Sequence, residues 1–262
     1  LKFKKNNPEL NYTQMTMGEL SKLPVHNGLL NFKITNTSFY ILNILNDDSS
    51  AIKFFWKNKH DEESLDLWYD ISKEKGTFID VGAHTGLYTL TSLKSNLQNN
   101  VIAFEPYFMN MARLITNLRI NGINQNVSTI IGAVSDFDGK AKFNIDTNSS
   151  YLSKGGKLNQ TGFDTNVFKL DSLYLNKLQL PLNGIKIDTE GEDFKVLKGA
   201  TKLIINYRPK IIVEVREQNK IDINNFFNEN NYRLYDVLDL STQINLTDYS
   251  INNISNIFAD PI

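Results

Sequence analysis

Four acidic residues stand at or near the ends of short apolar runs that are spread along most of this chain. They are Asp80, Glu105, Asp188 and Glu214. Each run has the length and composition of a buried parallel strand. Ligands of parallel sheets bind outside the carboxyl ends of the strands, so these side chains are expected to line one crevice. Carboxylates there can bind hydroxyl groups, hold a cationic group or remove a proton.

A glycine turn follows the first of these runs. Gly82 and Gly86 bracket it, and it contains Ala83 and His84. From residue 87 onward the apolar residues recur at helical spacing. Strand, glycine turn and helix form the first unit of a nucleotide-binding sheet, in which the ligand lies against the turn and the helix N-terminus.

Two classes of ligand fit this turn. A dinucleotide fingerprint requires G-x-G-x-x-G, whereas this chain has D-x-G-x-x-x-G, the loop of enzymes that bind S-adenosylmethionine (SAM). Asp80 can hold the ammonium group of a methionine moiety, and it would repel a pyrophosphate. The turn taken alone leaves both classes open, and such a turn can also be purely structural.

Two further strand ends suit the other parts of a nucleoside ligand. Glu105 stands 23 residues after Gly82, where an acidic side chain can accept hydrogen bonds from both ribose hydroxyls. An exposed strand-end carboxylate is the alternative interpretation of Glu105. Gly132 and Ala133 lie near the end of the run 127–134, and backbone groups there can contact an adenine edge.

The elements that must position these residues alternate along the chain. Strands are predicted at 78–81, 101–104, 127–134, 184–188, 211–215, 232–238 and 254–258, and helices at about 61–71, 87–97, 111–118, 194–204 and 223–227. This alternation predicts an α/β fold, a doubly wound seven-stranded mostly parallel sheet. The last two strands form its antiparallel edge. A turn at 136–139 leads to a returning strand, 141–145, and the polar stretch 147–166 is expected to be a lid or binding loop, or disordered.

The first 60 residues are expected to form an N-terminal arm and hairpin extension, followed by a catalytic domain over residues 61–262. Runs at 32–34, 39–42 and 52–56 have a β-like pattern, and 46–50 is a turn between two of them. Lys53, Lys57, Lys59 and His60 form a basic patch there. We expect this patch to be a solvated surface or the rim of an acceptor site.

Composition excludes several function classes. The 262 residues carry a net charge of −1 and no cysteine. The absence of cysteine excludes disulfides, thiolate metal sites and a cysteine nucleophile. A near-neutral chain has no electrostatic case for binding nucleic acid, and no apolar run approaches the ~18 residues of a membrane span. A cytoplasmic protein is expected.

Five motifs together resemble the FkbM family of SAM-dependent methyltransferases, over roughly residues 60–260. They lie at 78–86, 103–106, 185–191 and 198–200, and at Arg208-Pro209 followed by the strand with Glu214. The block Lys-Ile-Asp-x-Glu-Gly at 186–191 is the most specific of them. One departure is His84, where members of the family usually carry Asn.

The resemblance implies the class I methyltransferase fold and the transfer of a methyl group from SAM to a hydroxyl. The acceptor would be a small molecule, a sugar, a glycan or a natural product. The residues expected to bind SAM are Asp80, Gly82, Ala83, His84, Gly86, Glu105, Pro106 and Ala133.

Methyl transfer to a hydroxyl requires alignment of the reacting atoms and removal of the hydroxyl proton. Asp188 or Glu190 is the expected base. In an alternative, Asp188 and Glu214 act as oxygen ligands for Mg²⁺, as in catechol-type O-methyltransferases; this is ranked below the base because further ligands are not evident. Asp188 and Glu190 can also serve only as capping residues of the next helix.

Three rival functions remain at this stage. An NAD-dependent oxidoreductase would require the third glycine of the fingerprint, which is missing. A nucleic-acid methyltransferase is disfavoured by the near-neutral charge. A non-catalytic SAM-binding module would bind SAM without turnover.

Overall fold

The computed structural model describes residues 2–35, 37–45, 48–58, 60–145, 156–251 and 254–262. Its central sheet consists of β3 (Thr77–Val81), β4 (Asn100–Glu105), β5 (Val127–Ile131), β10 (Leu182–Ile187), β11 (Lys210–Arg216), β12 (Tyr232–Asp236), β13 (Asp239–Ile244) and β14 (Ile254–Pro261). The order across the sheet is β13-β12-β14-β11-β10-β3-β4-β5. Strands β3, β4, β5, β10 and β11 are parallel, and β14 is antiparallel to both of its neighbours. The predicted α/β fold with a mostly parallel sheet is confirmed.

The central sheet has eight described strands, whereas seven were predicted. The predicted C-terminal pair is present as β12 and β14, but β14 is an interior strand, and β13 forms the edge beyond β12. Side chains of β13 are exposed at five of its six positions. The strand therefore lacks the apolar alternation by which a strand is recognised in sequence.

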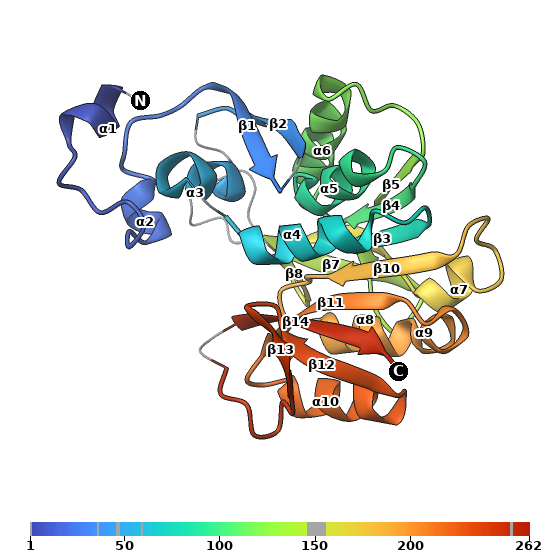
Figure 1. Cartoon of the computed structure of the whole chain (residues 1–262). Helices are drawn as coiled ribbons and strands as arrows, with labels where there is room; N and C mark the ends of the chain where they lie inside the picture. Colours follow the sequence, from blue (N-terminus) through green and yellow to red (C-terminus); the bar gives the residue numbers. More distant parts are fainter. Residues whose placement is uncertain (1, 36, 46–47, 59, 146–155, 252–253) are drawn as a thin grey trace.

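Helices cover both faces of this sheet (Figure 1). One face carries α4 (Glu62–Ile71), α5 (Leu87–Ser95) and α6 (Phe108–Ile120), and the other carries α7 (Leu170–Tyr174), α8 (Asp193–Gly199), α9 (Thr201–Tyr207) and α10 (Lys220–Glu229). Successive residues of β3 enter different cores: Phe78 packs against Trp68 of α4, whereas Ile79 shares a core with Val196 of α8. The strands are apolar on both sides because both sides are buried. The helix predicted at 194–204 is divided at Ala200 into α8 and α9.

A second, four-stranded sheet replaces two predicted features. It contains β6 (Ala133–Val134), β7 (Gly139–Ile145), β8 (Gly156–Asn159) and β9 (Phe163–Phe168), in the order β6-β9-β7-β8. The strand predicted at 127–134 is divided at Gly132, because β5 pairs with β4 whereas β6 pairs with β9. The stretch 147–166, expected to be a lid or binding loop, or disordered, forms β8 and most of β9 in its second half, so the alternative of disorder is wrong there; residues 147–155 lie outside the described part.

The N-terminal region contains α1 (Lys2–Asn6), α2 (Met17–Leu20), the hairpin of β1 (Gly28–Ile34) and β2 (Thr37–Asn43), and α3 (Ser49–Lys57). The hairpin is confirmed, but the strand predicted at 52–56 is wrong, since these residues are helical. Asp48 accepts a hydrogen bond from the Ala51 N–H and so caps this helix. Ile52 and Trp56 are buried four residues apart on one helical face. The turn residues 46–47 lie outside the described part.

Figure 1 shows the hairpin beside α5 and α6, far from α10. Its buried side chains belong to the same core as α4, α5 and α6. None of the helices in the described part of the chain has the length and apolar content needed to cross a membrane.

Candidate active site

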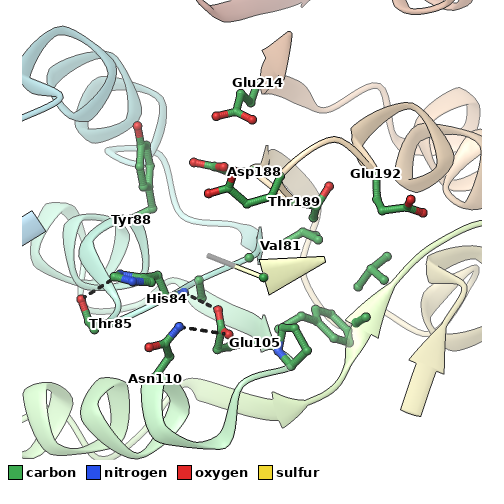
Figure 2. A pocket seen from close by; sticks show the side chains of 18 of the residues that line it. Val81, His84, Thr85, Tyr88, Glu105, Asn110, Asp188, Thr189, Glu192 and Glu214 are labelled. Atoms are coloured by element: carbon green, nitrogen blue, oxygen red, sulfur yellow. Dashed lines mark hydrogen bonds between the residues drawn. The ribbon is translucent and has the colours of Figure 1, made fainter. Parts of the chain in front are cut away.

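A pocket of about 430 Å³ opens at the carboxyl ends of β3, β4, β10 and β11. The turn after β3, the β4–α6 junction, residues 132–134 and the segment after β10 supply most of its wall. Figure 2 shows Glu105 with its hydrogen-bond donors at one end and the carboxylates of Asp188 and Glu214 at the other. Three of the four acidic residues singled out in the sequence therefore line one pocket.

The turn after β3 is held by backbone hydrogen bonds to β4. The N–H groups of Gly82 and Ala83 both donate to the Phe104 carbonyl, at 3.0 and 2.9 Å. Gly82 has a φ of +81°, and a Cβ at this position would lie 1.9 Å from the Asp188 carbonyl oxygen. Only glycine therefore allows β3 and β10 to approach this closely at their ends.

Glu105 is fixed by three donors. One carboxylate oxygen accepts the His84 N–H at 2.9 Å, and the other accepts the Tyr107 N–H at 2.9 Å and Asn110 Nδ2 at 3.3 Å. The side chain is 5% exposed, and this burial raises the pKa of Glu105. These hydrogen bonds fix the orientation of the Glu105 carboxylate, which faces the pocket. Asn110 was not predicted, because an amide inside a helical pattern carries no distinguishing sequence signal.

Two of the predicted cofactor residues do not reach the pocket wall. Asp80 is 2% exposed and accepts a hydrogen bond from Thr89 Oγ1 at 2.6 Å. Burial raises its pKa to about 6. Gly86 begins α5. Asp80 thus bonds to α5, whereas the residues that do line the pocket are Gly82, Ala83, His84, Glu105, Pro106 and Ala133.

The acidic residues after β10 and β11 have different partners. Asp188 Oδ2 lies 3.6 Å from Lys186 Nζ. Glu190, exposed at the rim, and Glu214 each accept a 2.7 Å hydrogen bond from Arg216. Burial, with Asp188 and Asp193 as nearby charges, raises the pKa of Glu214 to about 8 despite the Arg216 contacts.

Neither Asp188 nor Glu190 caps the next helix: the N-cap of α8 is Glu192, whose side chain makes no capping hydrogen bond. Asp193, in the first turn of α8, accepts hydrogen bonds from the Thr189 N–H at 2.8 Å and the Gly191 N–H at 3.1 Å. Asp188 is therefore not used as a cap, and its carboxylate remains at the pocket wall.

The magnesium alternative does not fit this arrangement. Both proposed ligands already pair with protein cations, Asp188 with Lys186 and Glu214 with Arg216. A metal ion between them would have to displace or repel these cations. In the part of the chain that the structure describes, no three or more histidine, aspartate or glutamate side chains converge as a metal site.

A further wall comes from residues outside the predicted cofactor and catalytic sets, although Lys53 and His60 belong to the predicted basic patch. Helix α3 contributes Ser49, Ser50 and Lys53 to the pocket wall, and the residues before α4 contribute His60 and Asp61. Two more come from Tyr88 of α5 and Asn256 of β14. The Tyr88 hydroxyl donates to Asp61, and Asn256 Nδ2 donates to the other oxygen of Asp61 at 3.1 Å. Burial and the charge of Lys53 lower the pKa of His60 to about 4. These contacts link residues up to 195 positions apart, which local patterns cannot predict.

Part of the predicted basic patch thus faces the pocket through Lys53 and His60; Lys59 lies outside the described part. The second sheet adds Phe143 and Leu158 to the wall. The wall therefore combines apolar side chains of the second sheet with hydroxyl, amide and carboxylate groups.

Comparison with known proteins agrees with this geometry. The family described as "Methyltransferase FkbM domain" matches residues 80–234, more than half of the 262 residues. Methyltransferase FkbM from Methylobacillus flagellatus KT is 13% identical, with a TM-score of 0.50 over 80% of this chain and 53% of that protein. The chain thus spans about half the length of that protein. The METTL16 MTase domain is 9% identical, with a TM-score of 0.50 over 87% of this chain and 85% of that domain.

No curated protein matches the sequence significantly. At these identities the solved structures support the fold alone, and the sequence match over residues 80–234 carries the assignment. The chain belongs to the FkbM methyltransferase family.

Proposed function

We propose that the protein transfers a methyl group from SAM to a hydroxyl group of a sugar, glycan or natural-product acceptor. One observation carries the proposal: a single pocket joins the Glu105 end, suited to a nucleoside, to the Asp188 end, suited to a hydroxyl acceptor. Family membership supports the reaction class, and the acceptor is inferred from the pocket.

The residues present fit the cofactor. Glu105 has its carboxylate held in place for the two ribose hydroxyls, and the backbone of Gly82, Ala83 and His84 forms the adjoining cradle. Pro106 and Ala133 border the place expected for the adenine. SAM, when bound, supplies an electrophilic methyl group on a positively charged sulfur. We propose that Asp80 acts only by supporting the turn.

The polar end of the pocket suits an acceptor with several hydroxyl groups. Ser49, Ser50 and Asn256 can donate and accept hydrogen bonds, and the carboxylates accept them. An apolar acceptor could form no hydrogen bonds with these groups, whereas an acceptor with several hydroxyls can. A sugar or glycan therefore fits better than an apolar natural product.

Asp188 is the base that the geometry favours over Glu190. Its carboxylate is 41% exposed at the pocket wall, whereas the carboxylate of Glu190 is bound by Arg216 at the rim. Asp188 would accept the hydrogen bond of the acceptor hydroxyl and take its proton as the new C–O bond forms and the methyl–sulfur bond breaks, with the electron pair of that bond left on sulfur.

Paired substitutions test this proposal. Asp188→Asn should leave SAM binding, measured by calorimetry, nearly intact and lower the rate of methyl transfer to a panel of sugars by ~10²–10⁴. Glu190→Gln is the matched control and should retain most of the rate. Binding of NAD but not SAM would refute the methyltransferase function, and methylation of RNA but not of sugars would refute the proposed acceptor.

A further inference from the structure

A lysine side chain is buried within the central sheet directly beside the pocket. Lys186 of β10 is 1% exposed and is among the largest fully buried side chains of the described chain. A buried ammonium group is costly unless its charge and its donors have partners. A strand interior at this place normally carries an aliphatic residue.

The ammonium group of Lys186 is surrounded by an amide oxygen, a backbone carbonyl oxygen, a carboxylate and an aromatic ring. Nζ lies 3.3 Å from Asn256 Oδ1, 3.3 Å from the Ile187 carbonyl oxygen and 3.6 Å from Asp188 Oδ2. It also lies 5.0 Å from the centre of the Tyr88 ring. Asn256 and Tyr88 are themselves held by Asp61. The position of Nζ is therefore fixed by β14, α5 and the start of α4.

Several acidic groups surround this cation. Asp188, Asp61, Glu214 and Asp193 raise the pKa of Lys186, against the effect of burial, and Asp80 faces it from the neighbouring strand. Arg216 contacts Glu214, and Thr189 and Gly191 contact Asp193. Among the described contacts, Lys186 is the cation that pairs with Asp188.

We propose that Lys186 is a positioning residue: its buried ammonium group keeps the Asp188 carboxylate charged and oriented toward the acceptor. The inference rests on the proposed function, in which Asp188 takes the proton. Lys186 is too deeply buried to touch an acceptor itself, whereas Asp188 is 41% exposed. An ammonium group at this distance favours the charged form of a carboxylate.

The test follows the ionisation of Asp188 directly, without an acceptor. In the full-length protein, ¹³C NMR would record the carboxyl resonance of Asp188, assigned with Asp188→Asn, as the pH is varied. In Lys186→Gln the midpoint of this titration should rise by about 1–3 pH units. Lys186→Arg, which keeps the charge, should restore most of the wild-type midpoint. Lys73→Gln, a change at an exposed lysine paired with Asp70, should leave it unchanged.

A folded Lys186→Gln protein with an unchanged Asp188 midpoint would overturn the proposal, because a residue that only fills space would not move it. If Lys186→Gln does not fold, Asn256→Ala replaces it. That variant removes one anchor of the ammonium group and should raise the midpoint by a smaller amount; no rise would again overturn the proposal.

The failure of this inference can be distinguished from failure of the proposed function. Wild-type protein that binds no SAM and methylates no sugar refutes the function, whatever the Asp188 titration shows. Where the wild type is active, Lys186→Gln should slow methyl transfer at least tenfold, but should add little in an Asp188→Asn background, since both changes act through one carboxylate. Additive losses would contradict a role of Lys186 through Asp188.

Discussion

The carboxylates of the pocket differ chemically because their immediate neighbours differ. Glu105 accepts hydrogen bonds from two backbone N–H groups and an amide, which orients it for binding. Glu190 is held by Arg216 at the rim. Asp188 combines a buried cation behind it with an open pocket in front. Residues of similar chemistry thus acquire separate roles from the groups that contact them.

Glu105→Gln should weaken SAM binding without unfolding the protein. The substitution removes the charge and turns one acceptor into a donor that faces N–H groups. Loss of charge-assisted bonds to the ribose hydroxyls should cost about 1.5–3 kcal/mol, or roughly 10–150-fold in Kd. Calorimetry measures this change. Glu217→Gln, at an exposed carboxylate paired with Lys220, is the control, and equal affinity of the two variants would remove Glu105 from the binding site.

Glu214 should make folding stability depend on pH. Its pKa is raised to about 8 in the folded protein from an ordinary value of 4.5, so the folded state holds this proton more tightly than the unfolded state. The contribution to stability is complete below pH 4.5 and is lost as the pH rises through about 8. Urea unfolding at pH 6 and pH 9 should show a larger loss in wild type than in Glu214→Gln. An identical loss of stability in the two proteins would mean that Glu214 is not the group whose protonation stabilises the folded state in this pH range.

Residue patterns predicted part of the pocket wall but not the pairing of its charges. Six of the eight predicted cofactor residues line the pocket, because strand ends of one sheet converge at one edge. Asp80 does not line the pocket, because its buried side chain is bonded to Thr89 of α5. Asn256 and Asp61 were missed because their contact spans most of the chain. The residue types of Asn256 and Asp61 and the spacing of their sequence neighbours do not indicate this contact.

Among the elements, those with strong periodicity were predicted and those with mixed patterns were not. β3, β4 and α6 follow from apolar runs and helical spacing. In α3, the apolar residues 52, 54, 55 and 56 satisfy both a strand and a helical pattern. The cap at Asp48 and burial against Leu20 decide for the helix. This difference matters for function, because α3 contributes to the pocket.

The junction of β3 and β10 predicts a specific sensitivity to a single methyl group. Gly82→Ala would place Cβ 1.9 Å from the Asp188 carbonyl at a φ of +81°. Strain and overpacking should together cost about 2–5 kcal/mol. Gly122→Ala is matched in φ, +70°, but its Cβ has no neighbour within 4 Å, so a cost of about 1–2 kcal/mol is expected. Chemical denaturation of both variants measures the difference in their free energies of unfolding. Equal losses of stability would mean that β10 can shift away from the added Cβ without cost.

At the scale of the whole molecule, the hairpin and the methyltransferase fold share a core. Phe32 and Phe39 of the hairpin belong to the same buried cluster as Trp68, Leu90 and other residues of α4, α5 and α6. Asn117 of α6 and Asn121, which directly follows this helix, also bond to the backbone of β2. A domain boundary near residue 60 remains a proposal. The shared core indicates that the residues before and after this position depend on each other for stability.

Phe32→Ala tests that dependence. The ring is 1% exposed and lies 3.8 Å, centre to centre, from Phe54, so its removal should cost about 3–5 kcal/mol. With a continuous core, tryptophan fluorescence and far-UV circular dichroism should report one coincident urea transition, shifted to lower concentration. Tyr40→Ala, on the exposed face of the same hairpin, should change stability by less than about 0.5 kcal/mol, because the Asn121 contacts of Tyr40 involve only its backbone. The opposite outcome would be a separate transition of Phe32→Ala at low urea concentration, with the main transition unchanged. The first 60 residues would then be an independently folding unit. Residues 61–262 would fold without them, and α3 would only add a wall to the pocket.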